Sequence, residues 1–232
     1  MGEDDMGTDN ERCITAYRDV RSRMTALARP LDGASTTATV PATPAWQVRD
    51  LLAHVVGVAS DIVAGRIEGA GSDPWTAAQV DTRRDRSVDE LLEEWEAASP
   101  AVDEILAAME AVQAGQVVFD VTTHEHDLRG ALGAPGARDS DGVAIGWTWA
   151  TGILGQLRDG YGSGALELRT PEGTTVAGSG TPTGAVEADR FELWRAMTGR
   201  RSAEQVNAWR WEGEPATAQL CLLPARSTPL VE

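Results

Sequence analysis

Three side chains of this 232-residue chain have the types and the spacing of a metal site: His54, Asp120 and His124. Asp120 and His124 are four residues apart, so on a helix they project side by side and can bind one ion together. Two imidazoles and one carboxylate suit zinc or another divalent ion and leave a fourth position open. From spacing alone a second interpretation stays open, in which each histidine only packs and forms hydrogen bonds at the edge of an apolar stripe.

Helical periodicity predicts which histidines face the protein interior. Apolar residues at positions 117, 121, 128 and 132 form a stripe whose centre lies within about 50° of His124, so we expect His124 to point into a helical bundle. Asp120 lies one turn earlier, at the edge of this stripe. His54 flanks the apolar stripe of an earlier helix and can reach the same interior. His126 falls on the opposite face, and we expect it on the surface.

Other polar residues are candidates for roles around this site. Asp127 lies one turn after His124 and can orient its imidazole as a hydrogen-bond acceptor, although a simple bond between helices fits equally well. Six arginines can bind a substrate carboxylate: Arg83, Arg84, Arg86, Arg129, Arg200 and Arg201. Most of them are expected to be ordinary surface charges, and our candidate catalytic residues are Asp127, Arg129, Arg200 and Arg201. The tryptophans expected in the core rather than at a cofactor are Trp46, Trp147 and Trp149.

The composition excludes several classes of function. A net charge of −16 disfavours nucleic acids and anionic membranes as partners, because their binding depends on basic residues. All 20 basic residues are arginine, which excludes a Schiff-base lysine and a phosphate-loop lysine. Cys13 and Cys221 are too isolated for a disulfide framework. Without a run of roughly 20 apolar residues or a basic, apolar leader, we expect a cytoplasmic protein.

Patterns along the chain predict the elements that must position these residues. Helices are expected over residues 13–28, from Thr43-Pro44 to Gly65 or Gly69, and over 88–112, 116–132 and 142–158, with a polar stretch after the second. After Gly160, glycines separate short segments typical of strands, at 166–168, 174–176 and 207–211, and one more helix is expected over 187–198. We therefore expect a helical bundle over residues 8–160 and a small α/β domain over 161–232.

Three segments resemble the mycothiol-dependent maleylpyruvate isomerase family. The run Pro44-Ala-Trp46-Gln-Val-Arg-Asp50-Leu-Leu-Ala-His54 is similar to the family's helix-opening motif of Trp, three residues, Asp-Leu, two residues and His. Asp120-x-x-x-His124-x-x-Asp127-Leu128 is similar to its acidic-x-x-x-His-x-x-Asp-Leu segment. Leu193-Trp-Arg-Ala-Met-Thr-Gly-Arg-Arg-Ser202 is similar to the Gly-Arg-Arg-Ser stretch of its C-terminal extension.

The resemblance implies a fold and a chemistry. The fold would be a DinB-like four-helix bundle that binds a divalent metal such as Zn²⁺ through His54, Asp120 and His124, followed by a small, sterol-carrier-like α/β domain. The thiol would be mycothiol, the thiol cofactor of actinobacteria, deprotonated by the metal and added to a small electrophilic, carboxylated substrate. The enzyme would be an isomerase or a thiol S-transferase, acting as a monomer or homodimer. Asp120 stands where the isomerase would carry Glu, one methylene longer, so the metal site is expected to persist while the specific activity differs.

Two other functions remain open on this scaffold. A metallohydrolase or lyase would activate water at the open position instead of a thiol. A non-catalytic module would use the metal for stability alone and bind a ligand or partner through its C-terminal unit. One fold hosts many reactions, so the fold does not choose among them.

Overall fold

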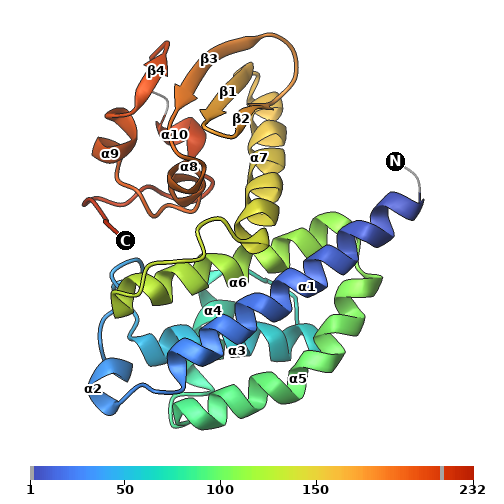
Figure 1. The fold of residues 1–232 in the computed structure, drawn as a ribbon, viewed down its shortest axis with the longest axis vertical. Coiled ribbons are helices and arrows are strands. Elements are labelled where there is room, and N and C mark those ends of the chain that lie inside the picture. The colour runs from blue at the N-terminus through green and yellow to red at the C-terminus, as the bar shows by residue number, and fades with distance from the viewer. Residues whose placement is uncertain (1–2, 215–216) are drawn as a thin grey trace. The chain divides into compact units, whose positions relative to one another are not determined.

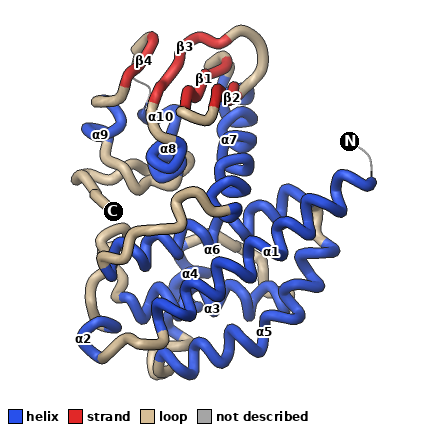
Figure 2. The backbone as a smooth tube through the Cα atoms, in the orientation of Figure 1, coloured by secondary structure: helices blue, strands red, loops and turns tan. Residues whose placement is uncertain are grey.

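The computed structural model describes residues 3–214 and 217–232 and divides the chain into two compact units. The first unit comprises Met1–Gly136 together with Glu232, and the second comprises Ala137–Val231. Helices predominate in the first unit, whereas the strands of the described residues all lie in the second (Figure 2). The predicted combination of a mainly helical part and a small α/β part is confirmed.

The first unit is the predicted bundle. Its main helices are α1 (Glu3–Ala28), α3 (Val48–Val63), α5 (Val88–Ala108) and α6 (Ala111–Leu132) (Figure 1). Helix α1 packs against α5 and α6, and α3 packs against the same two helices. The short helices α2 (Gly33–Thr36) and α4 (Asp73–Asp81) both contact α3. Among the described residues of this unit, its four long helices thereby enclose one apolar core.

Local sequence signals explain where two of these helices begin and end. Helix α5 begins with a capping box, in which Ser87 and Glu90 bind each other's backbone N–H groups. Helix α6 ends at Gly133, which takes the left-handed conformation at φ 59° that residues with a side chain rarely adopt.

The predicted start of the second helix is wrong by several residues. Thr43 and Pro44 lie in a turn, and α3 begins only at Val48. The reason is a different cap: the side chains of Gln47 and Asp50 form a capping box at this position. Trp46 therefore precedes the helix instead of lying within it.

The polar stretch after α3 contains a helix that the periodicity did not indicate. Helix α4 begins where the Ser72 hydroxyl accepts a hydrogen bond from the Trp75 N–H, with Pro74 in its first turn. Its sequence has no apolar stripe, and among its side chains only Gln79 is classed as buried. The cap and the proline were therefore the only signals of this helix.

The second unit combines α7 (Asp141–Tyr161) with a mixed sheet. Its strands are β1 (Ala165–Thr170), β2 (Gly173–Ala177), β3 (Pro182–Glu187) and β4 (Arg210–Glu212), in the order β2-β1-β3-β4. Strand β1 is antiparallel to β2 and parallel to β3, and β4 is antiparallel to β3. The remaining helices are α8 (Arg190–Met197), α9 (Ala203–Asn207) and α10 (Thr217–Leu220).

The domain division expected from the sequence lies between residues 160 and 161 and stays a prediction. Helix α7 belongs to the second compact unit, because the two units divide between Gly136 and Ala137. The physical reason is its packing, because α7 contacts β1, β2 and α8. Gly155 permits this contact, since a Cβ there would lie 2.8 Å from the backbone nitrogen of Gly178 after β2.

In the described part of the chain, no helix is long and apolar enough to cross a bilayer.

Candidate metal centre

His54, Asp120 and His124 come together in the bundle. One candidate ligand atom from each residue lies within 4.8 Å of the other two. His54 is supplied by α3, whereas Asp120 and His124 occupy successive turns of α6. The imidazoles are 4% and 7% exposed, and their ring centroids are 4.8 Å apart. The structure therefore brings together the three side chains that spacing singled out.

Asp127 fixes the orientation of the His124 ring. The two residues are linked by a 3.1 Å hydrogen bond between His124 Nδ1 and Asp127 Oδ2, and Asp127 is fully buried. An ionised carboxylate only accepts hydrogen bonds, so with Asp127 ionised, Nδ1 of His124 would carry the proton and leave the lone pair on Nε2. Nε2 faces Asp120, whose Oδ1 is 3.8 Å away. Asp127 thus occupies the orienting position that we considered for it from the sequence.

Gln79 forms a hydrogen bond with Nδ1 of His54, as Asp127 does with Nδ1 of His124. It was not among the residues predicted from the sequence. His54 Nδ1 and Gln79 Oε1 are 2.7 Å apart, and Gln79 Nε2 donates to Asp61 Oδ2 at 2.9 Å. Asp61 in turn pairs with Arg66 at the end of α3. The N-terminal cap of α4 was the available signal, because a helix starting at Ser72 carries Gln79 on its second turn.

The donor set fits a divalent ion. In a tetrahedral zinc site, nitrogen and oxygen ligands lie about 3.4 Å from one another. The observed separations of up to 4.8 Å therefore require only a small inward movement of the side chains. Both histidines receive support at Nδ1, which is the usual arrangement when Nε2 binds a metal. Three ligands leave one position of a tetrahedron for a further group.

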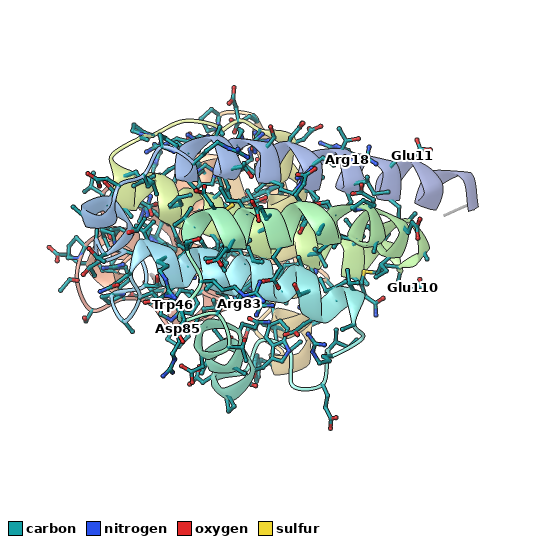
Figure 3. All side chains as sticks on the ribbon, turned by 90° about the horizontal axis from the view of Figure 1, so that it is seen from below. Glu11, Arg18, Trp46, Arg83, Asp85 and Glu110 are labelled. Carbon is teal, nitrogen blue, oxygen red and sulfur yellow. The ribbon has the colours of Figure 1, made fainter. Side chains whose placement is uncertain are left out.

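Trp46 covers this site, although we expected it in the core. Its ring centroid is 5.0 Å from that of His54 and 5.9 Å from that of His124, and the side chain is half-buried. The turn before α3 holds it there, through hydrogen bonds from the Trp46 N–H to the Thr43 carbonyl and from the Val40 N–H to the Trp46 carbonyl. Figure 3 labels Trp46 and Arg83 in the part of the bundle formed by α3 and α4.

The prediction for His126 is wrong, because this residue is buried at 3% exposure. Helical periodicity separates an inner from an outer face only where one side of the helix meets solvent. Every residue of α6 from Val121 to Leu128 is buried, so the segment has no exposed face. Burial alone therefore does not show which of His124 and His126 is a candidate ligand. His124 is the candidate because its side chain converges with His54 and Asp120.

The candidate arginines have carboxylate or carbonyl partners. Arg129 binds Glu125 and the carbonyl of Ala134. Arg201 is 2% exposed and binds Glu192 through two nitrogens. Arg200, in the same unit as Arg201, donates to the carbonyl of Thr198. The other three candidates pair with acidic residues of α4 and α5: Arg83 and Arg86 with Glu94, and Arg84 with Asp81.

A pocket of about 640 Å³ lies beside α4. Gln79, Trp75 and Arg83 are among its lining residues. Two of these also contact His54, Gln79 by its hydrogen bond and Trp75 by an edge-on ring contact at 6.5 Å. The pocket and the His54 ring therefore share Gln79 and Trp75 as neighbours.

Comparison with known proteins agrees with these features. The family model described as the mycothiol maleylpyruvate isomerase N-terminal domain matches residues 17–133, which is half of the chain. No curated protein matches. Two similar solved structures are the mycothiol-dependent maleylpyruvate isomerase, with a TM-score of 0.60, and a histidine-to-alanine mutant of it, with a TM-score of 0.59. Each is 15% identical and covers 82% of this chain and 89% of its own, which establishes a shared fold. The chain belongs to the mycothiol maleylpyruvate isomerase family through its N-terminal domain.

Proposed function

We propose that this protein is a divalent-metal-dependent enzyme that uses mycothiol to isomerise, or to transfer a thiol to, a small electrophilic and carboxylated substrate. The observation that supports this most directly is the convergence of His54, Asp120 and His124 within 4.8 Å, inside the domain that matches the family. Both imidazoles are held at Nδ1, so both can offer Nε2 to one ion.

The residues of the site have distinct roles in this proposal. A divalent ion bound here would provide an open position at which the mycothiol thiol loses its proton near neutral pH. His54 and His124 bind as neutral imidazoles, and Asp120 supplies one negative charge. Asp127 keeps the His124 ring in its binding orientation. Trp46 lies against both imidazole rings, where we propose that it limits the access of water to the open position.

The proposed carboxylate contacts rest on arginines that are already engaged. A substrate carboxylate would compete with Glu125 for Arg129 and with Glu192 for Arg201. Arg129 lies on α6, the helix that carries Asp120 and His124, so we propose it as the first of the candidate arginines to vary when a substrate is known.

Metal analysis of the purified protein tests the ligand set. We expect close to one zinc or similar divalent ion per chain. His54→Ala and His124→Ala should each abolish metal retention, whereas His126→Gln, a buried control on the same helix, should retain it. Asp120→Glu restores the family's ligand length and should also retain the metal. Equal loss in His126→Gln and His124→Ala would contradict the proposed ligands.

Cobalt substitution tests the thiol. Sulfur coordination to Co²⁺ produces a charge-transfer absorption band that nitrogen and oxygen ligands do not produce. Mycothiol should therefore induce this band in the cobalt protein and not in His124→Ala treated in the same way. If saturating mycothiol induces no band while a substrate is hydrolysed without it, the metallohydrolase replaces this proposal.

A further inference from the structure

We infer that Gln79 is a positioning residue that fixes the tautomer of His54 for metal binding, and that Asp61 fixes Gln79. This inference rests on the proposed function, because it assigns a role toward the same metal. The relay is a chain of two hydrogen bonds: His54 Nδ1 to Gln79 Oε1 at 2.7 Å, and Gln79 Nε2 to Asp61 Oδ2 at 2.9 Å.

The chemistry of Asp61 determines the direction of both bonds. Asp61 pairs with Arg66, and an ionised carboxylate accepts hydrogen bonds but donates none. Gln79 must therefore turn its NH₂ group toward Asp61 and its oxygen toward His54. An amide oxygen only accepts, so the His54 Nδ1 must carry the proton. The lone pair is then on Nε2, the nitrogen available to a metal ion.

Burial makes this orientation effective. Gln79 is 2% exposed and Asp61 is 9% exposed, so water has little access with which to replace either hydrogen bond. In such surroundings a wrongly turned amide would place its oxygen against the Asp61 carboxylate, acceptor facing acceptor, and would lose the hydrogen bond to Asp61. The Asp61 carboxylate therefore favours the amide orientation that selects one tautomer of His54.

Gly57 allows α4 to approach closely enough for this contact. It lies one turn after His54 on α3, so both residues are on the same face. A Cβ at Gly57 would be 2.5 Å from Gln79 Cβ and 2.7 Å from Gln79 Cγ, distances that require one of the helices to move. The absence of a side chain at Gly57 therefore sets the position of Gln79 relative to His54.

The first measurement reads the tautomer directly in metal-free protein. ¹⁵N NMR at pH 8 should show His54 protonated at Nδ1 in the unchanged protein. Gln79→Met, which keeps the side-chain length but cannot accept this bond, should shift His54 toward the Nε2-protonated form. Gln113→Met, at an exposed position of α6, is the matched control and should change nothing. An Nε2-protonated His54 in the unchanged protein would overturn the inference.

The second measurement is Zn²⁺ affinity, determined by competition with a chromophoric chelator. Gln79→Met should weaken Zn²⁺ binding by about 10–100-fold, the usual effect of removing a residue that supports a metal ligand. Gln79→Glu alone places a second carboxylate against Asp61 and should also weaken binding. Combined with Asp61→Asn it should restore the affinity, since Glu accepts from His54 and Asn donates to Glu. An affinity within twofold of the parent for Gln79→Met would refute the metal role.

Gly57→Ala keeps the inference testable if the Gln79 variants fail to fold. It should weaken Zn²⁺ binding with all polar groups present, whereas Gly152→Ala should not, because a Cβ there meets nothing within 4 Å. Unchanged affinity and tautomer in Gly57→Ala would count against the positioning of Gln79. A parent protein that binds no Zn²⁺ would overturn the proposed function, while the NMR measurement would still decide whether Gln79 controls the His54 tautomer.

Discussion

Glu125 is the buried charge whose replacement should destabilise the bundle most clearly without disturbing the candidate metal site. It is fully buried on α6, next to His124 in sequence, and it binds Arg23 of α1 and Arg129 of its own helix. Arg23 approaches both carboxylate oxygens at 2.7 Å, and Arg129 approaches Oε1 at 3.0 and 2.9 Å. The carboxylate therefore joins α1 to α6.

Glu125→Gln keeps the shape of this side chain but removes its charge. The glutamine amide can accept hydrogen bonds only at its oxygen. Its NH₂ group then faces an arginine guanidinium, so two hydrogen-bond donors oppose each other. Breaking a buried ion pair from one side costs roughly 3–5 kcal/mol. The arginine side chains are 29% and 13% exposed and recover part of this cost by hydration, so we expect about 3 kcal/mol. At about 2–4 °C per kcal/mol for a chain of this size, the Tm should fall by roughly 6–12 °C.

Urea unfolding of the metal-free protein measures this free energy. Glu11→Gln is the control, because Glu11 lies exposed on α1 (Figure 3) and its replacement should cost no more than about 0.5 kcal/mol. Zn²⁺ affinity should stay within about threefold of the parent, because the Glu125 carboxylate binds arginines and not His124. A free energy of unfolding within about 1 kcal/mol of the parent would refute the assignment of Glu125 as the link between α1 and α6.

Three further predictions concern other residues. Burial raises the pKa of Glu94, but hydrogen bonds, chiefly from Arg83, lower it by more, so the net pKa lies below the ordinary 4.5. The ionised Glu94 therefore stabilises the fold above pH 4.5. The difference in the free energy of unfolding between the parent and Glu94→Gln, measured in urea, should shrink as the pH falls below that value. An unchanged difference would contradict this sign. Gly133→Ala should cost about 1–2 kcal/mol in thermal unfolding, because φ is 59° there, and a cost no greater than that of Gly152→Ala would argue against strain. Burial raises the pKa of the Cys221 thiol to about 11, so iodoacetamide at pH 8 should modify it far more slowly in native than in urea-unfolded protein, and equal rates would disprove this.

Spacing could identify the candidate ligands because their geometry is local. Asp120 and His124 are neighbours on any helix, and the apolar stripe around His124 indicates the interior. His54 follows from the same argument on α3. The burial of His126 could not be predicted in this way, because periodicity describes one buried face and α6 is buried on all sides from Val121 to Leu128.

The parts that sequence reasoning missed depend on packing between separate segments. Gln79 is polar, in a helix without an apolar stripe, and its function follows from contact with His54 twenty-five residues earlier. Similarly, α7 has the pattern of a bundle helix, but its packing partners are strands that follow it in the chain. Apolar periodicity predicts that a face is buried, and it does not predict which element covers it.

In the proposed function, the origin of the three candidate ligands would couple metal supply to the folding of the bundle. Two of them form a half-site as soon as one turn of α6 exists, whereas the third arrives only when α3 docks against α6. An ion that needs all three binds the assembled bundle and not the open chain, so it shifts the equilibrium toward assembly. At an ion concentration 1,000 times Kd, this shift amounts to about 4 kcal/mol. Cells starved of the ion would therefore contain more unfolded protein, and proteolytic turnover would rise before any catalytic defect in the remaining molecules could be measured.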